Sequence, residues 1–446
     1  MRKLNPGTRF AAFLLAVCFS VGMARAEIRQ LTILHTNDLH ARLLPLDNGR
    51  GGFARLATAL ERERRASEAC LILNAGDLVQ GSPVSTIFHG VPIYEIANLF
   101  GFDAATLGNH EFDYGWQTIP KFLKTARYPV VVSNLVDGEG KRMTDKPYVI
   151  LKVRGLRVGV IGALTGDLPS LTTPKTRGDW RILPVVETVR RYIAEVRPQA
   201  DLVVLLSHLS PAEETQALEQ LDQVSVIVSG HAHRGLAAPI PFQDRVLVRV
   251  SAYGGEFGRL DLKVDTKAKK MVSYTHKRIP VDASIAPNEA VSGLIAKWEA
   301  EVAKVVDVPI GEAAKEFPRP EVRALMERAM AEMTGSRFAF INQGGVRDAL
   351  PKGRLMARHV WNVMPFDNKV VVGTFKGRQL PEAVTRGRKV DPDADYRFVT
   401  SDFNAANQNA PGGFGTTGLV FREEGGLLRD LFIDWIKQQK MLKAAD

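Results

Sequence analysis

Side chains of the types that commonly bind metal ions follow five short apolar runs of the sequence, at residues 31–37, 71–76, 104–108, 202–207 and 226–230. The side chains that follow these runs are Asp38, His40, Asp77, Asn109, His208, His231 and His233. Hard divalent ions prefer carboxylate and amide oxygen, and borderline ions also accept imidazole nitrogen. A carboxylate can bridge two ions about 3.5–4 Å apart. The set therefore has the number and character of ligands for hydrolysis by two metal ions.

Each of these residues has a simpler explanation when it is considered alone. A single His after a strand is more often a hydrogen-bonded structural residue, and Asp or Asn at that position often caps a helix. Short motifs also recur by chance. Recurrence of the same pattern at five strand ends favours one shared site over five separate structural roles.

Strands and helices in alternation are needed to bring these ligands together. Short apolar runs that end in Gly, Ser or Asn are typical of buried strands. Helical patterns lie between several of them, at 53–67 and 185–196. This alternation predicts an α/β sandwich. Because ligands bind beyond the carboxyl ends of strands in such layers, we expect the seven side chains at one edge.

The first 26 residues have the pattern of an export signal. A basic start, the apolar stretch 10–23 and the small residues Ala24 and Ala26 predict cleavage before Glu27. The alternatives are a lipid anchor on Cys18 or retention as a membrane helix, for which the stretch is short. We expect a periplasmic protein without a membrane anchor, with secretion beyond the cell as the alternative.

The charge balance suits a small anionic substrate. The formal net charge is +10, with 45% apolar and 24% charged residues, which is typical of a soluble globular protein. A basic surface attracts anions, and the alternative is that the charge serves only the solubility of the chain. No basic run is interleaved with aromatic residues, so a nucleic-acid polymer is not the expected partner. These features do not specify an oligomeric state.

The order of the motifs resembles that of the calcineurin-like metallophosphoesterases. The fuller phrases at 33–40, 76–77 and 108–115 are similar to those of the branch that includes 5′-nucleotidases and UDP-sugar hydrolases. The resemblance implies a four-layer α/β/β/α sandwich followed by a smaller α/β substrate-binding domain. The implied parts are a signal at 1–26, a metallophosphoesterase domain at 27–284, a linker helix at 285–310 and a 5′-nucleotidase C-terminal domain at 311–446.

The resemblance also implies how the ligands are shared between two metal ions. One ion would be held by Asp38, His40, Asp77 and His233. The other would share Asp77 and also be held by Asn109, His208 and His231. Mn, Zn, Co and Mg all tolerate this mixture of nitrogen and oxygen, so the metal identity stays open.

His110 and Asp113 are implied as a catalytic pair. In the family the histidine steadies the phosphoryl group and the leaving oxygen. A neighbouring carboxylate orients an imidazole and favours its charged form. The alternative for Asp113 is an acid in the first turn of a helix, where it interacts with the helix dipole.

Three segments after residue 311 resemble the family's substrate site, at 338–347, 364–368 and 401–405. The resemblance implies that Arg347 meets the phosphate and Asn368 contacts the substrate. Phe366 and Phe403 would sandwich a flat base, since two apolar faces hold a nucleobase by stacking. The alternative places both phenylalanines in the core.

Three departures from the family pattern affect the same region. Residues 321–325 replace the usual start of a helix, so a family arginine does not transfer securely to Arg323. The segment 412–416 lacks the aspartate that would grip the substrate, and the connection between residues 380 and 391 is short. These changes bear on the choice of substrate and leave the metal chemistry unaffected.

The implied activity is hydrolysis of phosphate esters, with release of phosphate from nucleoside monophosphates as the first expectation. A UDP-sugar hydrolase and a 2′,3′-cyclic-nucleotide phosphodiesterase use the same metal chemistry and are alternatives. More distant alternatives are a thiosulfohydrolase and a non-catalytic protein that binds nucleotide or metal.

Overall fold

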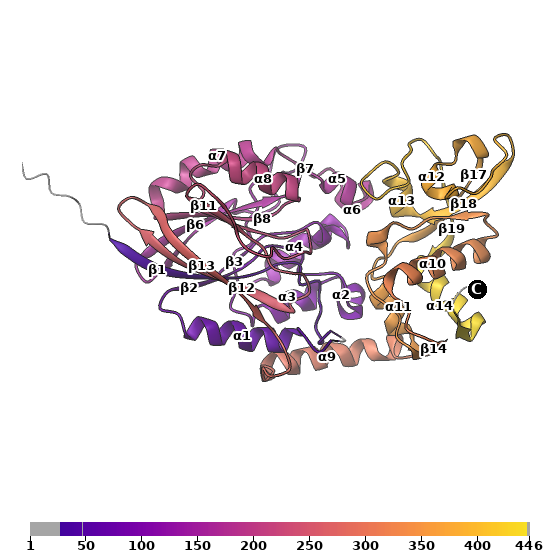
Figure 1. Cartoon of the computed structure of the whole chain (residues 1–446), viewed down its shortest axis with the longest axis horizontal. Coiled ribbons are helices and arrows are strands. Elements are labelled where there is room, and N and C mark those ends of the chain that lie inside the picture. The colour runs from indigo at the N-terminus through magenta and orange to yellow at the C-terminus, as the bar shows by residue number, and fades with distance from the viewer. Residues whose placement is uncertain (1–26, 47, 444–446) are drawn as a thin grey trace, which may run out of the picture.

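The computed structural model describes residues 27–46 and 48–443, and the predicted export signal lies outside this part. Figure 1 shows a larger N-terminal body and a smaller C-terminal body, with helix α9 (Glu289–Val306) running along the lower edge of both. Within the described ranges, no helix combines the length and apolar character needed to span a bilayer.

Two sheets form the centre of the N-terminal body. The first has the order β13 (Lys270–Pro280), β12 (Glu256–Asp265), β1 (Ile28–Thr36), β2 (Cys70–Asn74) and β3 (Ala104–Ala105). The second has the order β10 (Ile240–Phe242), β11 (Arg245–Val248), β9 (Val226–Ser229), β8 (Leu202–His208), β6 (Leu156–Leu164) and β5 (Tyr148–Val153). Apolar side chains such as Leu73 and Val204 are buried between them.

Helices cover the outer face of each sheet. On the first sheet these are α1 (Phe53–Arg65), α3 (Val91–Ala97) and α4 (Ile119–Thr125). On the second they are α7 (Val185–Val196) and α8 (Pro211–Gln220). The predicted α/β/β/α sandwich is therefore confirmed, and so are the two helices predicted at 53–67 and 185–196.

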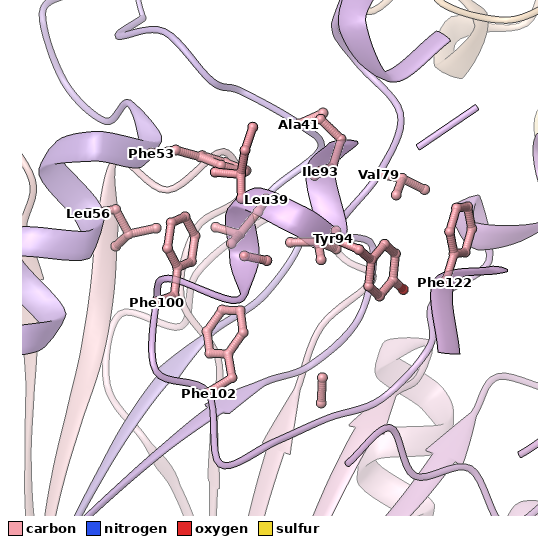
Figure 2. Close-up of a cluster of buried hydrophobic side chains, with 14 of the residues drawn as sticks. Leu39, Ala41, Phe53, Leu56, Val79, Ile93, Tyr94, Phe100, Phe102 and Phe122 are labelled. Carbon is pink, nitrogen blue, oxygen red and sulfur yellow. The ribbon is translucent and has the colours of Figure 1, made fainter. Parts of the chain in front are cut away.

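The aromatic core outside the first sheet anchors the loop that follows β1. Leu39 and Ala41, which alternate with two predicted metal ligands, are buried in this core (Figure 2). Phe53 and Phe100 meet edge to face, with ring centroids 5.1 Å apart. Burial of alternate residues fixes the loop, because apolar area is removed from water at about 25 cal/mol per Å².

The C-terminal body is built on two smaller sheets. One has the order β15 (Phe338–Ala339), β18 (Asp395–Ser401), β17 (Lys369–Lys376) and β19 (Arg422–Leu427). The other has the order β16 (Gly353–Met356), β14 (Pro309–Ala313) and β20 (Met441–Leu442). The helices α10 (Arg319–Thr334), α11 (Ala357–Val363) and α14 (Leu428–Gln439) pack around their core.

Helix α9 lies within the predicted linker segment and contacts both bodies. Trp298 packs on Phe88 of the N-terminal body, with ring centroids 4.8 Å apart. Glu299 accepts a hydrogen bond from Arg358 of the C-terminal body at 2.6 Å. The helix is therefore a packed connection between the two bodies.

A buried histidine pair in the first sheet makes the fold sensitive to acid. His35 on β1 lies opposite Gly258 on β12, where a Cβ would come 1.9 Å from the imidazole Nε2. That nitrogen is 3.2 Å from Nε2 of His276. Burial, together with the charge of His276, lowers the pKa of His35 to about 3. The fold therefore requires the neutral ring.

We expect the free energy of unfolding to fall as the pH drops from about 6.5 toward 3. The unfolded chain takes up a proton on His35 in this window and the folded chain does not, so His35 contributes a slope of up to about 1.4 kcal/mol per pH unit. Urea unfolding of His35→Gln at several pH values should show a shallower slope than the parent. Equal slopes in the two proteins would contradict this assignment, since the histidines other than His276 keep the same surroundings in both.

Candidate active site

The seven predicted ligands lie at the carboxyl ends of strands in the two sheets. The strands and their ligands are β1 with Asp38 and His40, β2 with Asp77, β3 with Asn109, β8 with His208, and β9 with His231 and His233. Parallel pairing aligns the strand ends, because Thr36 lies opposite Asn74 in one sheet and Ser207 lies opposite Ser229 in the other. The loops therefore start at the same level and converge at one edge.

The ligand loops turn through backbone conformations that are rare for residues with a side chain. φ is positive at Asp38 (50°), His40 (47°), Asp77 (53°), His231 (77°) and His233 (57°). Asp and His tolerate the left-handed region better than most residues, yet each such residue costs on the order of 1 kcal/mol. These turns direct the side chains toward one another.

A glycine makes room for the central carboxylate. A Cβ at Gly108 would lie 2.0 Å from Oδ1 of Asp77, so a larger residue would displace that side chain. The backbone N–H of His110 donates to the same oxygen at 2.9 Å. The Asp77 side chain belongs to the loop that follows β2, and the loop that follows β3 holds it in place.

Asp38, His40, Asp77 and His233 form the tightest group of ligands. One potential ligand atom from each lies within 4.8 Å of the others. Nε2 of His40 is 2.8 Å from Nε2 of His233 and 3.7 Å from Oδ2 of Asp77. The structure thus brings together the set predicted for one ion, and this group is a candidate metal site.

The other three predicted ligands surround Asp77 from the side of the second sheet and β3. Nε2 of His208 is 3.1 Å from Oδ2 of Asp77. The ring of His231 is 5.1 Å from that of His208, measured between centroids. Asn109, Asp77 and His231 together line one cavity between the two bodies.

Four buried atoms of the ligand residues have no hydrogen-bond partner among the described residues: His40 Nδ1, Asp77 Oδ2, Asn109 Oδ1 and His208 Nε2. Nδ1 of His208 donates to the carbonyl of Ala75 at 2.7 Å, so the neutral ring presents a lone pair at Nε2. Leaving such groups unpaired costs about 1–3 kcal/mol each. Facing acceptors of this kind fit a cation between them.

The electrostatics of the group also favour a positive charge. Burial raises the pKa of Asp38 to about 6, with Asp77 adding to the effect and His208 opposing it. Burial opposes protonation of His208, but Asp77 and Asp38 outweigh it and raise the pKa to about 10. A proton on His208 or a metal ion can supply the charge that the two carboxylates require.

His110 and Asp113 form the predicted pair at the edge of this group. Nδ1 of His110 and Oδ2 of Asp113 are 2.7 Å apart. Nε2 of His110 lies 4.0 Å from Oδ2 of Asp77. Both residues of the pair line the cavity, so the imidazole can hold a proton beside a bound ligand.

Three residues that sequence reasoning did not single out hold the ligands in place. The carboxylate of Glu111 accepts from the backbone N–H groups of Leu78 (2.9 Å) and Gly108 (2.6 Å). Asn37 Nδ2 donates to Asp38 Oδ2 at 2.7 Å, and Tyr253 OH is 3.5 Å from Nδ1 of His233. Glu111 lies inside the phrase 108–115, whereas Tyr253 carries no sequence signal.

One cavity of about 720 Å³ joins this group to the C-terminal body. The four predicted substrate residues, Arg347, Phe366, Asn368 and Phe403, all line it. The phenylalanines are therefore not confined to the core. The two bodies are joined near the cavity by a salt bridge of 2.8 Å between Arg42 and Asp348.

Arg347 and Phe366 reach across to the metal ligands. Nη2 of Arg347 is 3.5 Å from Nε2 of His40 and 3.5 Å from the side-chain oxygen of Gln80. The Arg347 guanidinium lies 5.8 Å from the centroid of the Phe366 ring. That ring stacks with His110, with centroids 6.1 Å apart. The C-terminal body thus contributes a cation and an aromatic face to the same site.

Arg323 lies apart from this cavity. It lines a neighbouring cavity of about 630 Å³ in the C-terminal body, and its Nε donates to Glu327 at 3.3 Å. Arg319 and Gln343 line both cavities. The structure therefore does not bring Arg323 together with the other predicted substrate residues.

Comparison with known families agrees with this architecture. The chain matches the model of calcineurin-like phosphoesterases over residues 31–235, and its fold and ligand group are those of a metal-dependent phosphoesterase. It also matches the model of the 5′-nucleotidase C-terminal domain over residues 305–386. The chain belongs to the calcineurin-like phosphoesterases that carry a 5′-nucleotidase C-terminal domain.

Individual relatives extend over most of the chain. Protein UshA of Yersinia enterocolitica is 25% identical and covers 89% of this chain and 84% of the relative. A 5′-nucleotidase of Vibrio cholerae is 25% identical and covers 84% of this chain and 85% of the relative. The crystal structure of a 5′-nucleotidase precursor from Thermus thermophilus is similar with a TM-score of 0.83 at 25% identity, over 94% of this chain and 98% of that chain.

Proposed function

We propose that the protein is a 5′-nucleotidase that releases phosphate from nucleoside monophosphates. The observation that carries this proposal is the sharing of one cavity by the buried ligand group, Arg347 and two phenylalanines. Its volume of about 720 Å³ lies within the range of small-molecule sites. Such a cavity offers charged groups to a phosphate at one end and aromatic faces to a base at the other.

In this proposal the ligand group would hold two divalent ions, and Asp77 would contribute to both. The seven residues that would hold the ions are Asp38, His40, Asp77, Asn109, His208, His231 and His233. When bound, such ions supply Lewis acidity to phosphoryl oxygens and lower the pKa of water. The nitrogen and oxygen ligands are compatible with Mn, Zn, Co or Mg.

The chain's own residues provide the remaining functions in this proposal. The Arg347 guanidinium offsets charge on the phosphoryl group, which grows as the ester bond breaks. Protonated His110 donates from Nε2 to the phosphoryl or leaving oxygen, and Asp113 holds the ring through Nδ1. Phe366 and Phe403 stack on the base, and Asn368 contacts the nucleoside.

Hydrolysis of a small panel of substrates tests the proposal, with phosphate release measured for the two monoesters and product formation measured for the other substrates. The panel consists of AMP, ribose 5-phosphate, UDP-glucose, 2′,3′-cyclic AMP and bis-p-nitrophenyl phosphate. Each is assayed after removal of metal with EDTA and after addition of Mn²⁺. We expect metal-dependent turnover with the highest kcat/KM for AMP, because AMP alone presents both a terminal phosphate and a purine.

The other outcomes are equally specific. A preference for UDP-glucose or the cyclic nucleotide would retain the metal chemistry and replace the substrate assignment. Equal kcat/KM for AMP and ribose 5-phosphate would show that the aromatic side chains do not contribute to recognition of the base. Absence of turnover with every metal would favour a non-catalytic binding protein.

A further inference from the structure

A buried arginine on the C-terminal helix holds the segment that carries Phe366. The side chain of Arg429, in the first turn of α14, is 3% exposed. Its Nη1 donates to the carbonyls of Met364 (3.4 Å) and Phe366 (3.2 Å), and its Nη2 donates to Oδ1 of Asp367 (2.9 Å). Its guanidinium lies 3.7 Å from the ring centroid of Trp361.

The segment 364–368 lies between α11 and β17 and belongs to neither a helix nor a strand. Its carbonyls are instead satisfied by other elements. Thr86 of the N-terminal body donates to Pro365 at 3.1 Å, and the backbone N–H of Leu428 donates to Asn368 at 2.8 Å. Because Arg429 serves two further carbonyls and a carboxylate, one planar cation fixes most of this turn.

The opposite aromatic wall is tied to the same segment. Oδ1 of Asp402 accepts from the backbone N–H of Lys369 at 3.0 Å and from that of Phe403 at 2.9 Å. The end of the segment at Asn368 is therefore linked to Phe403 through one carboxylate. A shift of the segment would change the spacing between the Phe366 and Phe403 backbones.

We propose that Arg429 is a positioning residue that sets Phe366 for the base of the substrate. Arg429 is not among the residues that line the cavity, so it acts through the segment that it holds. The inference rests on the proposed nucleotidase function. It adds a determinant of specificity on α14, which lies outside the residues 305–386 that match the model of the 5′-nucleotidase C-terminal domain.

Arg429→Lys is the first test. Lysine keeps the charge but has one nitrogen in place of the planar fork, so it cannot span the two carbonyls bound by Nη1 and the carboxylate bound by Nη2. We expect KM for AMP to rise about tenfold while kcat stays within about threefold, because a misplaced contact group weakens binding of the base. KM for ribose 5-phosphate, which has no base, should stay within about twofold.

Arg397→Lys is the matched control. Arg397 lies on β18 of the same body and also donates to a backbone carbonyl, that of Thr334 at 3.0 Å, and to the carboxylate of Glu424. It does not line the cavity. The control should leave the ratio of the two KM values unchanged, so a general loss of stability in the C-terminal body is separated from a specific effect.

A double-mutant cycle tests whether Arg429 acts through Phe366. In a Phe366→Ala background, Arg429→Lys should raise KM for AMP by less than about twofold, because the group that it positions is gone. Asp367→Asn provides a second variant, since Asp367 is 47% exposed and its replacement leaves the core intact. It removes the negative charge that pairs with Arg429, and it should raise the ratio of KM for AMP to KM for ribose 5-phosphate about threefold.

The possible failures are distinguishable. Absence of AMP turnover in the parent protein would overturn the proposed function. Normal AMP turnover with an unchanged KM ratio in Arg429→Lys would overturn the positioning role alone. If Arg429→Lys does not fold, an unchanged KM ratio in Asp367→Asn would overturn the positioning role. If Arg429→Lys does fold, full additivity with Phe366→Ala would also overturn it.

Discussion

Asp77→Asn is expected to lower kcat/KM for AMP about 10³-fold, which corresponds to about 4 kcal/mol. Asp77 is the residue that would be shared by the two ions of the proposed site, and its Oδ2 lies 3.1 Å from Nε2 of His208 and 3.7 Å from Nε2 of His40. An amide has one oxygen and no charge, so it would hold divalent cations much less tightly than a carboxylate. Initial rates and the metal content of the purified variant measure the loss.

The same variant should lose its stabilisation by metal. A ligand that binds the folded chain at 100 times its Kd adds about 2.7 kcal/mol to the free energy of unfolding. Mn²⁺ should therefore raise the Tm of the parent protein clearly and that of Asp77→Asn little. Asp201→Asn is the control, because Asp201 is also buried in the N-terminal body but pairs with Arg157. Equal losses of activity in both variants would contradict the assignment.

His110→Ala is expected to lower kcat for AMP about 10²–10³-fold with KM changed less than about threefold. The imidazole acts on charge that develops as the ester bond breaks, so its loss affects turnover more than substrate binding. Steady-state kinetics with AMP measure both constants. His276→Ala, on β13 and paired with His35, is the control and should keep kcat. Full turnover in His110→Ala would remove His110 from the mechanism.

The pH profile tests the partner of His110 separately. Burial opposes protonation of His110, but Asp113 and then Asp77 outweigh it and raise the pKa. The proposed active form carries the proton, so kcat is full below this pKa and falls as the pH rises through it. Asp113→Asn removes one of the raising charges and should move the fall to lower pH. An unmoved profile would show that Asp113 is a structural acid.

Local patterns were sufficient to predict which residues gather at this edge of the sheets, because each lies at the end of its strand or within four residues of it. Asp77 follows the apolar run that forms β2, and His208 is the last residue of β8. A run of apolar residues and the polar residue after it form one contiguous signal. Parallel pairing of the strands then places the polar residues of the separate runs at one edge of the sheets, so no long-range sequence pattern is needed to predict that they meet.

Hydrogen bonds between segments far apart in the sequence, which hold parts of the site in place, leave no comparable pattern. Asn37 hydrogen-bonds to Val250, 213 residues away, and Arg429 to Phe366, 63 residues away. A single hydrogen bond between distant segments alters neither a periodicity nor a motif, so it is visible only in the folded chain. The roles of the substrate residues and the domain boundaries stay predictions.

The positive φ angles at the ligands have a consequence for how such a protein changes when catalysis is not required. Glycine adopts these angles without steric cost, so in a metal-free protein replacement of Asp38 or His40 by glycine relieves on the order of 1 kcal/mol. Selection for stability alone would favour such replacements, since stability and activity trade off at strained positions. A relative with glycine at these positions is therefore expected to be robust and inactive.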